Sequence, residues 1–182
     1  QPPYPYKEEP VAILNADDQT KLAGALTMPD GTGPFPAVVL ISGSGAQDRD
    51  ETISGHKPFL VLADLLARRG AAALRCDDRG TGESGGEHLA ATPAVRAADV
   101  GWMIEYLLTR KETDRKRIFL LGHSEGSVIA SLAASRNPLV AGITLLGAPG
   151  LSIEESLYLQ NALLRKAEGA SDAAIAQANV LH

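Results

Sequence analysis

Residues 122–126 read GHSEG and form the segment of this chain with the clearest chemical potential. An apolar run at 117–121 precedes them, and a helical pattern at 128–133 follows. A G-x-S-x-G sequence between a strand and a helix is typical of a nucleophile elbow, a tight turn that strains the serine backbone and lifts its hydroxyl clear of the sheet. The pattern therefore predicts that Ser124 is a nucleophile for acyl transfer.

The residues around Ser124 suit the same chemistry. The neighbouring chain passes so close to such a turn that side chains at Gly122 and Gly126 would clash. Glu125 stands at the head of the predicted helix, where its backbone N–H can hold an oxyanion. The alternative is an ordinary Ser-Gly loop that caps a helix.

A second glycine-rich segment, residues 42–45, follows the apolar run at 37–41. Glycines let backbone amides point inward without obstruction by side chains. Enzymes with a nucleophile elbow take their second oxyanion N–H from the loop at this position. We predict that Ser44 supplies it, with Gly45 as the next candidate. The alternative is a flexible turn.

The polar segment 42–57 is long for a loop inside a compact domain, and such loops are usually functional. We expect Asp48, Arg49 and His56 to shape a substrate pocket, although mutual pairing or a solvated charge run would explain them equally well. His123 adjoins Ser124 in sequence. Because adjacent residues at an elbow point in different directions, we expect its ring to pack behind the end of the sheet.

Residues 80–85 match G-x-G-x-x-G, the fingerprint of a dinucleotide site. That fingerprint should leave a strand directly and open a helix. Here residues 77–79 intervene, and the next helical pattern begins only near Thr92. We therefore expect no cofactor at this segment, and predict that Asp78 and Arg79 tie down a structural loop beside the site.

The composition limits the remaining functions. The chain of 182 residues is 45% apolar and 21% charged, as expected for a single globular domain. A net charge of −5, without clusters of basic and aromatic residues, argues against nucleic acid as a partner. No apolar run approaches the roughly 20 residues of a membrane span. Cys76 is the one cysteine, and the four histidines lack paired ligand spacing, so we expect no metal.

The pattern of elements indicates how these segments are positioned. Strands are predicted at 11–14, 22–26, 37–41, 71–76, 117–121 and 140–146, and helices at 58–69, 92–109 and from 151 onward. Strands that alternate with helices predict an α/β fold with a doubly wound, mostly parallel sheet. Functional residues should then lie at the carboxyl ends of the strands. Residues 9–150 would form this core, after a Pro-rich linker or processed end at 1–8.

The chain resembles the α/β-hydrolase superfamily, and within it bacterial serine esterases and acyl-peptidase-like hydrolases. The matching segments lie at 38–51, 55–59, 75–84, 122–126 and 145–150. The resemblance implies that Ser124 is the nucleophile and that Glu125 and the Ser44 region supply the oxyanion amides. It also implies a small ester or a short acyl-peptide as substrate.

The sequence departs from this family in one respect. The triad of the fold runs Ser, then Asp or Glu, then His. Beyond Ser124 the only Asp is Asp172 and the only His is His182, and we do not favour that pair because a single strand follows the elbow helix. We expect a partial hydrolase that is inactive alone, with residues 151–182 as the start of a helical cap. His56 stays open as an internal base.

Other functions stay open at this point. The elbow cannot separate an esterase from a peptidase that acts on acyl-aminoacyl bonds, because both use the same acyl transfer. A catalytically incomplete fragment or binding module of the same fold is the non-enzymatic alternative. Oligomeric state and compartment are not determined, although the processed-looking start favours export.

Overall fold

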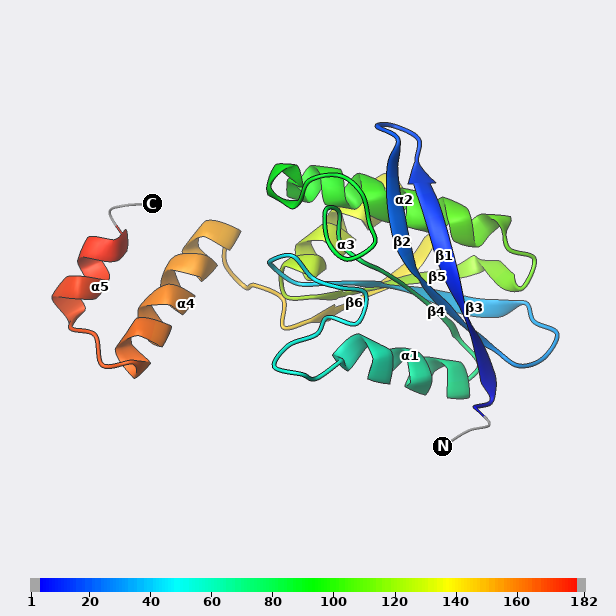
Figure 1. Ribbon diagram of the computed structural model, residues 1–182, viewed down its shortest axis with the longest axis horizontal. Helices are drawn as coiled ribbons and strands as arrows, with labels where there is room; N and C mark the ends of the chain where they lie inside the picture. The colour runs from blue at the N-terminus through cyan, green and yellow to red at the C-terminus, as the bar shows by residue number, and fades with distance from the viewer. Residues whose placement is uncertain (1–3, 180–182) are drawn as a thin grey trace. The chain divides into compact units, whose positions relative to one another are not determined.

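The computed structural model describes residues 4–179 (Figure 1). The chain divides into two compact units, Gln1–Ala148 and Pro149–His182. The strands described in the first unit are β1 (Tyr6–Asn15), β2 (Thr20–Pro29), β3 (Phe35–Ile41), β4 (Ala72–Cys76), β5 (Thr113–His123) and β6 (Val140–Leu146). Its helices are α1 (Pro58–Arg68), α2 (Pro93–Thr109) and α3 (Glu125–Arg136), with a 3-10 turn at His88–Ala90.

The strands form one sheet in the order β1-β2-β4-β3-β5-β6. The hairpin β1–β2 joins the sheet antiparallel to β4, whereas β4, β3, β5 and β6 run parallel to one another. From β3 the chain passes to β4 on one side and then returns to β5 on the other. The carboxyl end of β3 is therefore the topological switch point, where ligands bind in open α/β sheets.

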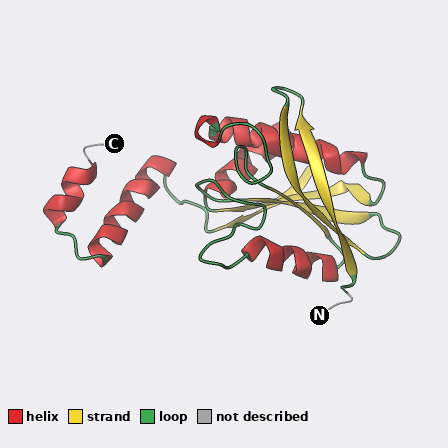
Figure 2. Ribbon diagram, viewed as in Figure 1, coloured by secondary structure: helices red, strands yellow, loops and turns green. Residues whose placement is uncertain are grey.

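Helices cover both faces of the sheet (Figure 2). On one face Val39 and Leu74 pack with Ile104 of α2 in a cluster that also includes residues of α3. On the opposite face Val38 packs with Phe59 of α1. Alternate residues of a strand point to opposite faces, so a strand covered twice must be continuously apolar. The doubly wound, mostly parallel sheet predicted from the sequence is confirmed.

The hairpin and β5 are longer than the sequence pattern predicts. Tyr6 pairs with Pro29 at the start of β1, so residues 6–8 belong to the sheet and not to a linker. The prediction at 1–8 is wrong for these residues, while residues 1–3 lie outside those described. Polar side chains concealed the pairing, because among residues 4–179 β1 pairs only with β2 and its outer positions face water.

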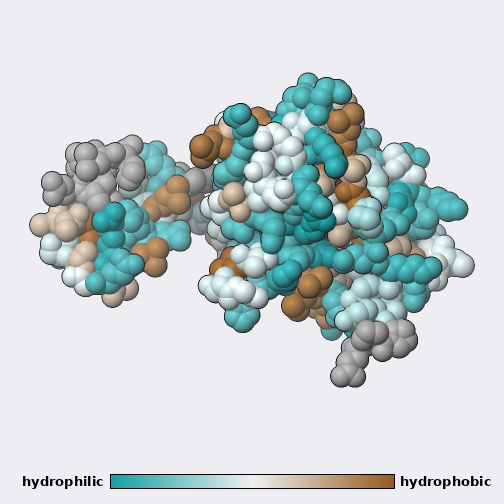
Figure 3. All heavy atoms as spheres, viewed as in Figure 1, coloured by the Kyte–Doolittle hydropathy of each residue, from teal (hydrophilic) through white to brown (hydrophobic). Residues whose placement is uncertain are grey.

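The second unit contains α4 (Ile153–Ala167) and α5 (Asp172–Asn179). A capping box formed by Ser152 and Glu155 starts α4. Leu157, Leu163 and Leu164 are more than half exposed in this unit. Among the described residues no helix is both long and apolar enough to cross a membrane. The visible face of the first unit is mostly hydrophilic, with scattered apolar patches (Figure 3).

Candidate active site

Ser124 occupies a strained turn between β5 and α3. Its φ is 52° and its ψ is −120°, a conformation that residues other than glycine rarely adopt. The Ser124 N–H donates to the Leu146 carbonyl at the end of β6, at 2.8 Å. The Ser127 N–H donates to the Ser124 carbonyl, and the Ser127 hydroxyl to the Gly122 carbonyl, both at 2.9 Å. These bonds hold the strained turn at the carboxyl edge of the sheet.

The two glycines of the turn lie where the backbone is crowded. A Cβ on Gly122 would come within 2.1 Å of the Gly126 carbonyl oxygen. A Cβ on Gly126 would come within 2.2 Å of the Ile41 carbonyl oxygen at the end of β3. The close approach expected from the sequence is present, and it brings the elbow against the loop that follows β3.

That loop, residues 42–45, is called the oxyanion loop below. A Cβ on Gly43 would come within 3.3 Å of the Ser124 Cβ, so the loop lies directly against the serine. The Gly43 N–H is engaged, because it donates to Glu51 Oε1 at 2.7 Å. Ser44 and Gly45 are exposed. Because the Gly43 N–H is already bonded, Ser44 and Gly45 stay the candidate backbone donors to an oxyanion.

A residue of α2, Arg96, contacts the peptide group between Gly43 and Ser44. Arg96 Nη1 lies 3.4 Å from the Gly43 carbonyl oxygen, at the long end of the hydrogen-bond range. In a trans peptide the N–H points opposite to the carbonyl. The Ser44 N–H therefore points away from α2.

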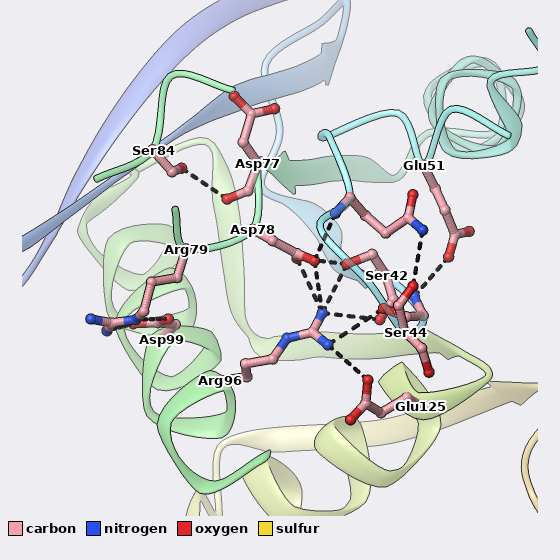
Figure 4. Close-up of polar contacts among 12 residues, drawn as sticks. Ser42, Ser44, Glu51, Asp77, Asp78, Arg79, Ser84, Arg96, Asp99 and Glu125 are labelled. Carbon is pink, nitrogen blue, oxygen red and sulfur yellow. Dashed lines mark hydrogen bonds and ion pairs between the residues drawn. The ribbon is translucent and has the colours of Figure 1, made fainter. Parts of the chain in front are cut away.

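Arg96 contacts three segments of the site at once (Figure 4). Its Nη2 donates to the Ser42 carbonyl at 3.2 Å and to the Ser42 hydroxyl at 3.0 Å. The same nitrogen lies 3.1 Å from both carboxylate oxygens of Asp78, in the loop after β4. Its Nη1 lies 3.2 Å from Oε2 of Glu125, the first residue of α3. The Arg96 side chain is 9% exposed, so water competes little for these contacts.

Asp78 is a buried carboxyl group between these loops. The Ser42 hydroxyl donates to Asp78 Oδ1 at 2.6 Å. Burial raises the pKa of Asp78, and the opposing effects of Arg96 and of the Ser42 hydroxyl do not fully offset it. The prediction that Asp78 ties down a loop beside the site agrees with these contacts. Arg79 bonds elsewhere, to Asp99 of α2.

The structure places two of the three predicted pocket residues, Asp48 and His56, in contacts within their own loop, and Arg49 in a contact with the loop after β4. Arg49 forms an ion pair with Asp77 at 2.6 Å. Asp48 accepts from the Thr52 N–H and hydroxyl within its own loop. His56 is exposed, and its backbone pairs with Ile53. Their part in a substrate pocket stays a prediction.

His123 contacts the loop after β3, whereas the sequence suggested packing behind the sheet. Its Nδ1 lies 2.8 Å from Glu51 Oε1, and its side chain is 39% exposed. The Glu51 carboxylate is 2% exposed, and a buried carboxylate needs donors. The Gly43 N–H is one such donor, and the His123 imidazole lies within hydrogen-bond distance of the same oxygen.

Across residues 4–179 no hydrogen bond joins an imidazole to the Ser124 hydroxyl. His182 lies outside the described residues, so its proposed pairing with Asp172 has no structural description. Asp172 begins α5, and its side chain is 89% exposed.

A cavity of about 40 Å³ lies behind the oxyanion loop, between the sheet and α2. Ser42, Asp78, Arg96 and Met103 contribute to its walls, and Ser124 does not. Its size suits a water molecule rather than a substrate, because small-molecule pockets measure several hundred Å³.

Sequence reasoning overlooked Arg96, and it considered Glu51 only as part of a charged run and not as a partner of His123. Arg96 precedes Val100 by four residues and Ile104 by eight, so it falls on the buried stripe of α2. A charged residue on an apolar stripe needs a buried partner, and that was the available signal. Glu51 lay hidden in a run of acidic residues in the loop after β3.

Comparisons with known proteins agree with this geometry. Residues 56–180 match the family model described as "Serine aminopeptidase, S33". The chain is 34% identical over 145 residues to the esterase EstD of Thermotoga maritima, a match that covers 77% of this chain and 34% of that protein. This chain therefore spans about one third of the length of its curated relative.

Solved structures show the same fold. The α/β hydrolase GrgF from a Penicillium species superposes with a TM-score of 0.67 at 21% identity, covering 91% of this chain and 56% of that one. An esterase of Pyrococcus furiosus gives a TM-score of 0.66 at 21% identity, with coverages of 90% and 55%. The α/β-hydrolase fold implied by the sequence motifs is confirmed. From its matching segments and its fold, the chain belongs to the serine aminopeptidase family of α/β hydrolases.

Proposed function

We propose that this chain carries the nucleophile and oxyanion hole of a serine hydrolase that cleaves carboxylic esters. The observation that carries the proposal is the strained elbow of Ser124, held at the switch point of the sheet against the oxyanion loop. A non-glycine residue persists in this conformation only where its surroundings impose it, and such sites cluster at catalytic centres. The name of the relative EstD, an esterase, supports an ester as substrate.

In the proposed reaction the Ser124 hydroxyl oxygen attacks the acyl carbon of the ester and gives up its proton to a base. The backbone amides of Glu125 and Ser44, with Gly45 as the alternative second donor, bind the oxyanion of the tetrahedral intermediate. The alcohol leaves with a proton as the acyl-enzyme forms. Water then attacks the acyl-enzyme and releases the acid. This chemistry needs no metal or other cofactor.

We propose that the base and acid of the triad lie outside residues 1–182. This view is supported by the bonding of His123 to Glu51 and by the relative's greater length. A serine hydroxyl is a weak nucleophile without an adjacent base, so the chain alone should be inactive. Residues 9–150 would then be the hydrolase core, and 151–182 the first part of a cap. His56 is the internal alternative for the base.

A second candidate is a peptidase that acts on acyl-aminoacyl bonds, and the family description, which names a peptidase, supports peptide rather than ester cleavage. Both candidates use the same nucleophile and the same oxyanion hole. The ratio of kcat/KM values for nitrophenyl esters and for acyl-aminoacyl anilides separates them.

Reaction of the full-length protein with a fluorophosphonate probe tests the proposal. We expect peptide mapping to place the label on Ser124. Ser124→Ala should lower kcat/KM for a nitrophenyl ester by about 10⁴- to 10⁶-fold, because triad members act as a unit. Ser135→Ala, at an exposed serine on the same helix, is the control and should keep full activity. An unlabelled Ser124 would favour a binding module, and turnover retained by Ser124→Ala would refute the assignment.

A further inference from the structure

Arg96 differs in its contacts from Arg79, another buried arginine of the sheet region. Arg79 is similarly buried, at 7% exposure, and its guanidinium binds Asp99, Asp18 and the Thr20 hydroxyl. Those partners lie on α2 and on the β1–β2 hairpin. Arg96, at 9% exposure, instead binds the loops that meet at Ser124.

The contacts of Arg96 reach residues on both sides of the candidate oxyanion hole. On one side it binds both oxygens of Ser42 and lies near the Gly43 carbonyl, whose peptide carries the Ser44 N–H. On the other side it binds the carboxylate of Glu125, whose own N–H is the second candidate donor. Asp78 holds the guanidinium in place between them.

We propose that Arg96 is a positioning residue that sets the two oxyanion amides at a fixed separation. This inference rests on the proposed function. Arg96 does not touch the reacting atoms and acts through the oxyanion loop and Glu125. A guanidinium presents five N–H donors in a rigid fork and can bond to three segments at once. A lysine ammonium keeps the charge but has three donors on a single atom, so it cannot span the same partners.

A misplaced oxyanion hole has a specific kinetic signature. The amides bind charge that develops in the transition state, so their displacement lowers kcat and leaves KM nearly unchanged. Loss of one whole donor costs about 10²- to 10³-fold in kcat. Because Arg96→Lys displaces donors without removing one, we expect a loss of about 10- to 100-fold in kcat, with KM within about threefold.

Arg79→Lys is the matched control, since it makes the same change at an equally buried arginine that does not contact the oxyanion loop. Both variants should unfold at lower urea concentration than the wild type. Only Arg96→Lys should lose kcat when both are assayed under conditions where they are folded. Glu125→Ala is a milder second variant, because it keeps the backbone N–H and removes one of the acceptors of Arg96. We expect it to lower kcat several-fold.

The experiment measures kcat, KM and urea unfolding of these variants in the full-length protein, with Ser124→Ala assayed in parallel. A selective fall in kcat for Arg96→Lys and Glu125→Ala supports the proposal. Equal kcat for the Arg96→Lys and Arg79→Lys proteins, or a rise in KM alone, overturns it. If the Arg96→Lys protein does not fold, an unchanged kcat in Glu125→Ala overturns it. Activity in Ser124→Ala overturns both this inference and the proposed function, whereas an inactive Ser124→Ala confines a failure to the role of Arg96.

Discussion

Ser124 adopts its strained backbone because neighbours on three strands leave no alternative. Its N–H is bonded to the end of β6, Gly126 allows the end of β3 to approach, and Gly122 allows the start of α3 to approach. A strained residue of this kind costs about 1–3 kcal/mol, which the surrounding contacts must offset. The elbow is therefore sensitive to changes at atoms that never meet a substrate.

Gly126 provides a test at this scale. In Gly126→Ala the new methyl group would lie 2.2 Å from the Ile41 carbonyl oxygen and 2.5 Å from that of Ser42. Both atoms belong to the backbone, so relief requires moving the end of β3. We expect the free energy of unfolding to fall by about 1–3 kcal/mol, and kcat to fall with it because the oxyanion loop shifts.

Gly101→Ala is the control, since its Cβ would meet nothing within 4 Å in the middle of α2. Alanine is favoured over glycine in a helix, so the free energy of unfolding of this variant should rise by about 0.5–1 kcal/mol. Urea unfolding of the full-length variants measures both changes. Equal stability of the two variants would contradict the crowding argument.

At the scale of elements, an ion pair joins the loop after β3 to the loop after β4. Arg49 donates to both carboxylate oxygens of Asp77, whose side chain is 3% exposed. Burial acts to raise the pKa of Asp77, but the bonds from Arg49 and from the Glu83 N–H outweigh it, so the pKa is lowered from 3.8. The ion pair thus holds together two of the loops that surround the site.

Asp77→Asn tests this link. We expect the free energy of unfolding to fall by about 1.5–3 kcal/mol at neutral pH, which is the contribution of hydrogen bonds to a charged group. A depressed pKa contributes stability above the unfolded value of 3.8 and loses it as the pH falls through the folded value. The difference in the free energy of unfolding between wild type and Asp77→Asn should therefore be constant from pH 7 to about pH 5 and should shrink below pH 3.8.

Glu83→Gln is the comparison for this prediction. Glu83 also pairs with Arg49 at 2.6 Å, but its side chain is 75% exposed. Exposed ion pairs contribute about 0–1 kcal/mol, so this variant should be close to wild type in urea unfolding at pH 7. A loss in Glu83→Gln as large as in Asp77→Asn would show that burial does not decide the strength of the pairs.

For the molecule as a whole, stability is concentrated in the central parallel strands. Val39, Leu74 and Leu120 are fully buried on β3, β4 and β5. Within the described residues β1 pairs only with β2, and its outer positions are exposed. Local opening should therefore start at the hairpin, while β3 opens only with the whole sheet.

Native-state hydrogen exchange of the full-length protein measures this gradient. We expect the amides of β3 and β5 to exchange only through global unfolding, and those at the start of β1 to exchange at least about tenfold faster. Equal protection of β1 and β3 would show that the hairpin opens with the sheet as one cooperative unit.

The sequence by itself determined the local features of the fold, which depend on residues close together in the chain. Continuous apolar runs predicted the buried strands, Thr92 and Pro93 marked the start of α2, and G-x-S-x-G placed Ser124 in a turn. These features are local, because backbone strain, capping and alternation act over a few residues. For the same reason the sequence predicted where the loops of the site begin.

Only the tertiary structure decided which distant side chains meet. Arg96 bonds to Ser42 across 54 positions, and His123 lies against Glu51 across 72. These pairs arise because the sheet order places β3 between β4 and β5, so loops that are far apart in the chain share one edge. Strand order results from the packing of both faces of the sheet, and no spacing of residues along the chain encodes it directly. The partners of Arg96 and Glu51 in the site therefore became recognisable only when the strands were assembled.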